Sequence, residues 1–161
     1  MTGANGSASE SWFRDGLRFE CTQCGNCCTG GPGVVGFTVD EGRAIAAHLG
    51  LTEGTFLDRF TRASGAQRSL KELRTEYGHD CVFLDRTGGL GRAVCSIYEV
   101  RPMQCRTWPF WPENLETPEA WESAKRMMPC HGMNRGRVHS YVEITVERDR
   151  DRKSEAFGEP A

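Results

Sequence analysis

The chain has 161 residues, of which 38% are hydrophobic and 26% charged, with a formal net charge of −2 and a pI near 6.1. This length suits one domain with a modest core, and the acidic balance argues against nucleic acid or anionic lipid as a partner. No apolar run approaches the ~20 residues of a membrane span, and residues 1–16 lack the basic start and apolar stretch of a secretory signal. We therefore expect a cytoplasmic protein with no membrane contact.

The two ends of the chain differ in composition from the middle. Residues 1–15 are mostly small and polar, and residues 147–161 are highly charged. Neither segment offers enough apolar surface to offset the entropy lost on ordering, so we predict a disordered lead-in and a charged, flexible tail. A single cysteine-bearing domain is expected over residues 16–146.

The first predicted helix runs from about Val39 to Leu49. Thr38 is its expected N-cap, with Glu41 as the partner of a capping box. Gly50 is placed to end the helix, since glycine readily adopts the left-handed backbone of a C-terminal cap.

A second helix is predicted after Thr52 by the same capping logic. Leu51 and Phe56 fall at the positions of a hydrophobic staple, and Phe60 continues the apolar face. This helix is therefore expected to pack by that face.

Residues 81–98 predict a β-hairpin. Two short runs suited to strands flank a glycine-rich turn, with Cys81 and Cys95 at the outer ends. The hairpin would therefore bring these two cysteines near each other.

A further helix is predicted after Thr117, with Trp121, Ala124 and Met128 on one face. Residues 138–147 are ambiguous. Their apolar residues alternate as in a strand, but a helix would also accommodate the segment.

Eight cysteines dominate the chemistry of the chain. Without an export signal, such thiols are expected to bind metal rather than to form disulfides. Cys21, Cys24 and Cys27 repeat the C-x2-C spacing, which directs three sulfurs at one centre. Bacterial-type ferredoxins share that spacing, but their C-P continuation is missing here, and zinc sites more often pair two distant C-x2-C units. By spacing alone, iron–sulfur and zinc centres both remain open.

Cys27 and Cys28 are adjacent in the sequence. Neighbouring side chains usually diverge, so we expect Cys28 to have a different partner from Cys27, among the cysteines that follow Asp80. Four more cysteines make two four-thiolate centres arithmetically possible, although the pairing stays open: Cys81, Cys95, Cys105 and Cys130. A dispersed residue such as Cys130 could also be a buried apolar side chain.

Eight thiolates would leave excess negative charge on two divalent ions. Arg101 and Arg106 are candidates to hydrogen-bond the sulfurs from outside the ligand shell. The aromatic run from Trp108 to Trp111 could shield the metal, present a surface to a protein partner, or pack in the core.

Four segments in this order resemble the YkgJ-like cysteine-cluster family: "CTQCGNCC", "CVFLD", "CSIYEVRPMQCRTWPF" and "PCHG". The resemblance extends from about Phe19 to Gly132. The family is described as a zinc- or iron-chelating domain, and flagellin lysine-N-methylases carry a related cluster.

The resemblance implies that all eight cysteines are metal ligands: Cys21, Cys24, Cys27, Cys28, Cys81, Cys95, Cys105 and Cys130. It also places Tyr98, Arg101 and Arg106 in the family's second block. His131 stands where the family tends to have proline, so a histidine ligand or a proton-bearing group beside the metal is open.

We therefore expect a small, irregular α+β fold organised by metal, with short helices and a hairpin around a cysteine-ligated centre. The expected function is binding of iron, as an iron–sulfur cluster or as the ion, or of zinc, with a small preference for iron. Structural, electron-transfer and metal-sensing or metal-carrying roles fit.

Two alternatives remain open. One is a metal-dependent redox or methyl-transfer enzyme or its accessory subunit, although no G-x-G-x-x-G after a strand and no Walker A motif is present. The other is a zinc-stabilised adaptor for a protein partner.

Overall fold

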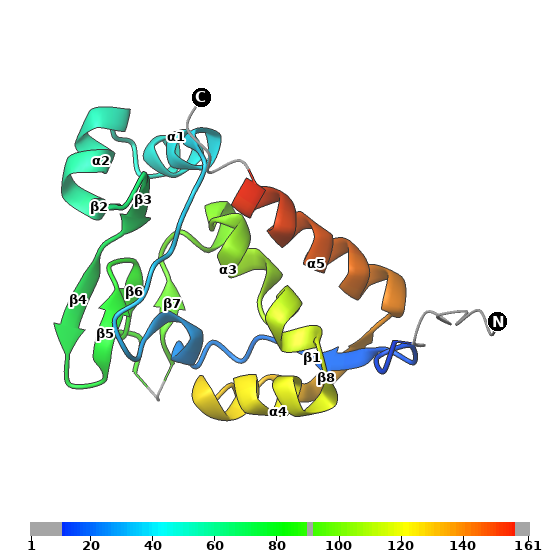
Figure 1. The fold of residues 1–161 in the computed structure, drawn as a ribbon. Helices are drawn as coiled ribbons and strands as arrows, with labels where there is room; N and C mark the ends of the chain where they lie inside the picture. Colours follow the sequence, from blue (N-terminus) through cyan, green and yellow to red (C-terminus); the bar gives the residue numbers. More distant parts are fainter. Residues whose placement is uncertain (1–10, 90–91, 157–161) are drawn as a thin grey trace.

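The computed structural model describes residues 11–89 and 92–156, and the fold is mixed α+β as predicted (Figure 1). The α-helices are α1 (Val39–His48), α2 (Glu53–Phe60), α3 (Met103–Thr107), α4 (Pro118–Met127) and α5 (Tyr141–Ala156). Short 3-10 helices are η1 (Asn26–Cys28), η2 (Tyr98–Val100) and η3 (Pro112–Leu115).

The strands form separate antiparallel pairs rather than one sheet. The pairs are β1 (Leu17–Phe19) with β8 (Met133–His139), β2 (Thr61–Ser64) with β3 (Gln67–Leu70), β4 (Glu72–Thr75) with β5 (Gly78–Cys81), and β6 (Leu84–Asp85) with β7 (Val94–Cys95). Because two-stranded hairpins are marginal on their own, they depend on packing against the helices.

The capped helices confirm the local predictions. The Thr38 hydroxyl accepts the Glu41 N–H at 3.2 Å, and the Glu41 carboxylate accepts the Thr38 N–H at 2.8 Å. Thr52 and Thr117 cap α2 and α4 through the same kind of bond to the third residue of the helix. These starts depend on side chains within one turn, which is why sequence alone predicts them.

The predicted hairpin is present but shorter, since β6 and β7 pair Leu84 with Cys95. Cys81 belongs instead to β5, where it lies opposite Glu72. The hairpins β2–β3 and β4–β5 were not predicted, because their strands are largely polar. They lack the apolar alternation that marks a half-buried strand.

The ambiguous segment contains both kinds of structure, with β8 ending at His139 and α5 beginning at Tyr141. Ser140 and Glu143 form a reciprocal capping box between them. The Ser-x-x-Glu spacing was therefore the signal that could have located this helix start.

Both predicted flexible ends are too long. Trp12 donates its indole N–H to Leu115 O at 2.9 Å, and Phe13 is 4% exposed. At the other end α5 continues to Ala156, and buried Asp151 accepts a hydrogen bond from the Thr107 hydroxyl. Residues 1–10 and 157–161 lie outside the described residues. Contacts with distant segments order these polar ends, so local composition could not reveal them.

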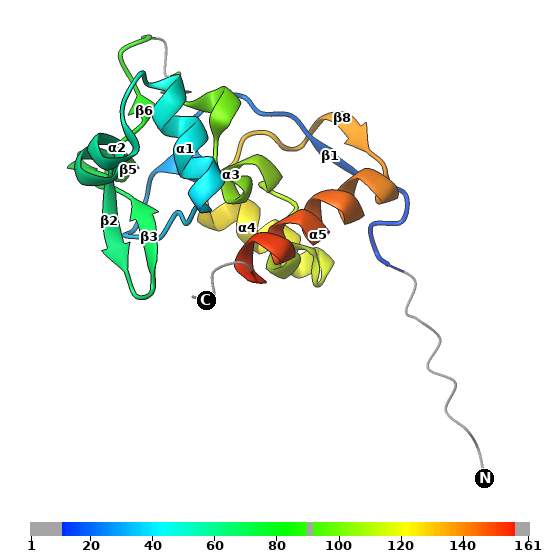
Figure 2. The ribbon, with the colours of Figure 1, turned by 90° about the horizontal axis from the view of Figure 1, so that it is seen from above.

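Two apolar clusters form the interior. The aromatic core contains Phe13, Trp108, Phe110, Leu115, Trp121, Cys130, Met133 and Ile144, and the α1–α2 core contains Ile45, Ala46, Phe56, Leu70, Phe83 and Ile97. Figures 1 and 2 both place α3 between α1 and α5, so this short helix connects the two halves. Among the described residues, no helix combines the length and apolar character needed to cross a membrane.

The predicted face of α4 is confirmed, since Trp121 is in the aromatic core with Ala124 and Met128 packed against it. Trp108 and Phe110 are only 6% and 3% exposed. Core packing therefore takes up most of the aromatic run.

Candidate metal centre

Six cysteines from distant parts of the sequence each interact electrostatically with at least two other cysteines. They are called the thiol cluster here: Cys21, Cys27, Cys28, Cys81, Cys95 and Cys105. Five of them, all but Cys81, line a cavity of about 80 Å³, the thiol cavity. That space exceeds the roughly 30 Å³ share of one water molecule in the liquid. The thiol cavity therefore has space for a metal ion and is lined by soft sulfur donors.

The thiol cavity lies where the two cores meet. Cys81 and Cys95 pack against the α1–α2 core, whereas Trp108 and Trp111 belong to or border the aromatic core and line the cavity. The cluster therefore joins elements from both halves of the molecule.

The sulfurs of Cys27 and Cys28 lie 3.8 Å apart, closer than expected for neighbouring side chains. Cys28 is also near Cys81 and Cys105, two of the later cysteines expected as its partners. Both residues belong to the 3-10 helix η1, which follows Gly25 in the left-handed conformation at φ 73°. Two thiolates on one tetrahedral zinc ion, with Zn–S bonds of about 2.3 Å, are separated by about 3.8 Å. The adjacent pair thus has the spacing of two ligands of the same ion.

The pKa values of this pair are shifted in opposite directions. The hydrogen bond between the two sulfurs lowers the pKa of Cys27 and raises that of Cys28, since one thiol donates to the other. Burial raises the pKa of Cys81 to about 11 and also raises that of Cys105. Most cluster thiols therefore hold their protons at neutral pH, and a metal ion would have to displace them.

Backbone hydrogen bonds from residues later in the chain lower the pKa of three cluster thiols. In each case the donor lies two residues after the cysteine. The pairs are Gln23 with Cys21, Phe83 with Cys81 and Ile97 with Cys95. Each bond lowers the pKa of its thiol against the larger effect of burial. Fixed donors of this kind stabilise thiolates in metal centres.

Arg101 lies beside the thiol cluster. It lines the thiol cavity, and its charge lowers the pKa of four thiols: Cys21, Cys27, Cys95 and Cys105. Its guanidinium lies 3.5 Å from the ring centre of Tyr98, which lines the same cavity. Arg106 faces a different cavity and lies 3.6 Å from the Glu41 carboxylate.

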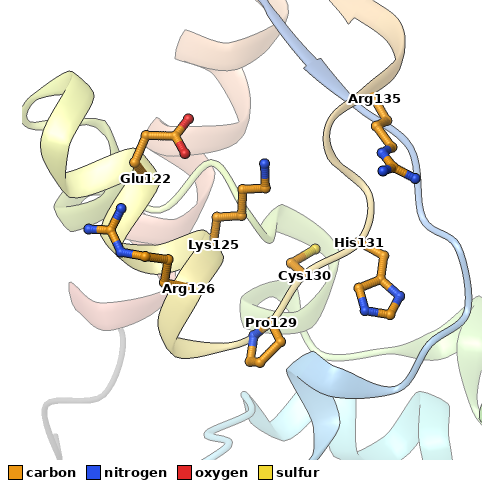
Figure 3. Close-up of a pocket in the computed structure, with 7 residues that line it drawn as sticks. All are labelled: Glu122, Lys125, Arg126, Pro129, Cys130, His131 and Arg135. Atoms are coloured by element: carbon orange, nitrogen blue, oxygen red, sulfur yellow. The ribbon is translucent and has the colours of Figure 1, made fainter.

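Cys130 and His131 lie apart from the thiol cluster. Cys130 is 8% exposed in the aromatic core, and both residues line a separate cavity of about 620 Å³ beside α4 (Figure 3). The apolar role considered for Cys130 thus fits its place. Cys24 lies near Cys21, whose pKa it raises, but does not line the thiol cavity.

An ion pair missed by sequence reasoning positions two of the cysteines. Asp80, 4% exposed, accepts hydrogen bonds from the Arg86 guanidinium at 2.7 and 3.1 Å and from the Thr29 hydroxyl. Thr29 follows Cys28 directly, and Asp80 precedes Cys81. The carboxylate therefore ties the N-terminal cysteine loop to β5.

The substitution Asp80→Asn should lower the free energy of unfolding by about 2 kcal/mol. Breaking a fully buried ion pair costs ~3–5 kcal/mol, and the loss is smaller here because Arg86 is 26% exposed. Arg86 lowers the pKa of Asp80 below 3.8, so the contribution is complete above that pH and is lost as pH falls through the lower folded value. Urea denaturation at matched metal content should therefore show a wild-type advantage that persists at pH 5 and shrinks below about pH 4.

Asp85→Asn is the matched control, because within the described part of the chain its exposed carboxylate accepts hydrogen bonds only from nearby Thr87. It should change stability much less than Asp80→Asn. Equal losses in the two variants would show that Asp80 has no special role in joining the loop to β5.

Among the described residues, no three His, Cys, Asp or Glu side chains stand together at ligating positions in the present arrangement. The donor set suits zinc or iron, and the Cys27–Cys28 spacing matches a shared ion, so the thiol cluster fits a metal by chemistry. The remaining sulfurs would need to move inward to complete a ligand shell.

Comparison with known proteins agrees with this chemistry. The CxxCxxCC family, described as "Putative zinc- or iron-chelating domain", matches residues 20–131. The uncharacterized protein MJ0661 of Methanocaldococcus jannaschii is 33% identical over 99 residues, covering 61% of this chain and 48% of that protein. The chain thus spans about half the length of this curated relative. No solved structure matches it.

The family match contains every cysteine of the thiol cluster, and it supports metal binding in general. Because the match covers more than half of the chain, this protein belongs to the CxxCxxCC family.

Proposed function

We propose that the protein binds zinc or iron through the thiol cluster, and that the bound ion links the two halves of the fold. The observation that carries this proposal is the 3.8 Å approach of the Cys27 and Cys28 sulfurs inside a cavity lined by five thiols. A structural metal supplies folding free energy where hairpins are short and cores small.

The number of thiols limits the kind of centre. With Cys130 in the aromatic core, seven cysteines remain, whereas two independent four-thiolate centres require eight. Seven thiols suffice for one ion with four thiolate ligands, or for two ions that share thiolates or take a ligand other than cysteine.

The Cys27–Cys28 spacing also bears on the metal. In a [4Fe–4S] cluster four cysteines serve four irons, so two sulfurs on one metal fit better with a single ion or a two-iron centre. We propose a tetrahedral centre in which Cys27 and Cys28 bind the same zinc or iron ion.

Residues around the thiol cluster stabilise the negative charge of the thiolates that would bind the metal. Arg101 and the backbone N–H groups of Gln23, Phe83 and Ile97 favour thiolates, and Trp108 and Trp111 cover one side of the cavity. Cys21 and Cys27 stay exposed to solvent, which favours a metal-carrying or metal-sensing role beside the structural one.

Anaerobic purification followed by metal analysis, sulfide analysis and an absorption spectrum tests the proposal. We expect one or two zinc or iron ions per chain and no more than two sulfides. Removal of the metal with a chelator should expose thiols to titration and lower the melting temperature, because bound metal stabilises only the folded chain. A metal-free protein whose thiols all titrate freely, and whose stability zinc and ferrous iron leave unchanged, would refute the proposal.

A further inference from the structure

A second cavity adjoins the thiol cavity and is built from different elements. It has a volume of about 500 Å³ and lies between α3, β1, β8 and α5, and it is called the arginine cavity here. No cysteine lines it, but Arg101 and Trp108 line both cavities. The arginine cavity therefore borders the proposed metal centre without sharing its ligands.

The lining of the arginine cavity is positively charged. Four arginines and two glutamates contribute, and the glutamates are already paired, Glu143 with Arg137 at 2.9 Å and Glu147 with Arg150 at 3.0 Å. The other two arginines, Arg101 and Arg106, form no ion pair with either of these glutamates.

The two remaining arginines have weak or no carboxylate partners. Arg106 lies 3.6 Å from Glu41, whose carboxylate also accepts the backbone N–H groups of Thr38 and Met103 at 2.8 and 2.7 Å. Arg101 donates Nε–H to Tyr98 O, and none of the described carboxylates lies within ion-pair distance of it. Both guanidinium groups thus retain donors for another acceptor.

Trp108 supplies an independent observation. It is 6% exposed, and its indole N–H is buried without a hydrogen-bond partner among the described residues. The other three tryptophans, Trp12, Trp111 and Trp121, all donate to oxygen atoms at 2.7–2.9 Å. An unmet buried donor is costly, so its presence beside two cavities calls for an acceptor that binds there.

We propose that the arginine cavity binds a small oxyanion, a phosphate or carboxylate group, through Arg101, Arg106 and the indole N–H of Trp108. Oxyanions only accept hydrogen bonds, and planar guanidinium groups match their geometry. Because Arg101 also touches the thiol cavity, the anion binds next to the metal centre. None of its proposed donors is a cysteine, so anion binding and metal content can be measured separately.

Indole N–H resonances in ¹⁵N NMR spectra test the site directly, with the protein as purified or zinc-substituted. Titration with inorganic phosphate or with citrate, each against sodium chloride at equal ionic strength, should move one of the four tryptophan signals downfield to saturation. That signal should be missing in Trp108→Phe, and the other three should stay in place. Phosphate and citrate arms identify which oxyanion group is preferred.

Arg106→Gln should weaken the binding about tenfold or more, the effect of losing one charge-assisted hydrogen bond. Arg126→Gln is the matched control, since it removes the same charge from the separate cavity beside α4 (Figure 3). Equal weakening in both variants, or no movement of the Trp108 signal with either anion, would overturn the proposal. Metal content measured in parallel keeps this result separate from the proposed metal function.

Discussion

Serine in place of Cys27 or of Cys28 is expected to lower metal affinity by more than about 100-fold, the upper range for loss of an outer-shell partner. The two sulfurs lie 3.8 Å apart, so each substitution should remove one ligand from the same ion. The hydroxyl of serine is a harder and poorer donor for zinc or iron than a thiolate. Metal analysis and competition with a chelator would measure the loss.

Cys130→Ala provides the matched control for these variants. Cys130 packs in the aromatic core and lines a cavity apart from the thiol cluster, so its replacement should leave metal content unchanged. Full metal content in Cys28→Ser would contradict a shared ion. Loss of metal in Cys130→Ala would restore this residue to the ligand set that the family resemblance implies.

The second large effect is expected at Gly25, which is buried between Cys24 and Cys27 at φ 73°. A Cβ atom there would lie 2.5 Å from the Ala93 Cβ and 3.2 Å from a Leu84 methyl group. Gly25→Ala should therefore destabilise the fold by about 2–4 kcal/mol, from left-handed strain plus overpacking. It should also weaken metal binding, because the cysteine loop can no longer lie against β6 and β7.

Gly54→Ala is the control, and its effect on the stability of the fold should have the opposite sign. Gly54 lies exposed in α2, where a Cβ atom meets nothing within 4 Å. Alanine there should stabilise the fold by about 0.5–1 kcal/mol through helix propensity. Urea denaturation of both variants separates the two effects, and a neutral Gly25→Ala would show that the loop tolerates displacement from the hairpin.

Features set by neighbours within one helical turn could be predicted from the sequence. The capping box of Thr38 and Glu41 and the caps at Thr52 and Thr117 need only side chains that reach the nearest free N–H groups. The same logic would have found Ser140 and Glu143, had the alternating apolar residues that follow not also suited a strand.

Features that depend on contacts between distant residues could not be predicted from the sequence. The polar hairpin of β4 and β5 is located by Asp80, which meets Thr29 and Arg86 only after folding. The close approach of the Cys27 and Cys28 sulfurs could not be predicted for a similar reason. The turn at Gly25 and its packing against Ala93, rather than the adjacency of the two residues, decide where the sulfurs lie.

The sequence by itself determined the chemistry of this protein, because cysteine spacing and thiol number already specify soft donors for zinc or iron. Only the tertiary structure decided which thiols come together, joining Cys21, Cys27, Cys28, Cys81, Cys95 and Cys105 and placing Cys130 in the aromatic core. The physical reason is that ligand type is a property of each residue, whereas ligand partition depends on how loops far apart in the chain pack against the two cores.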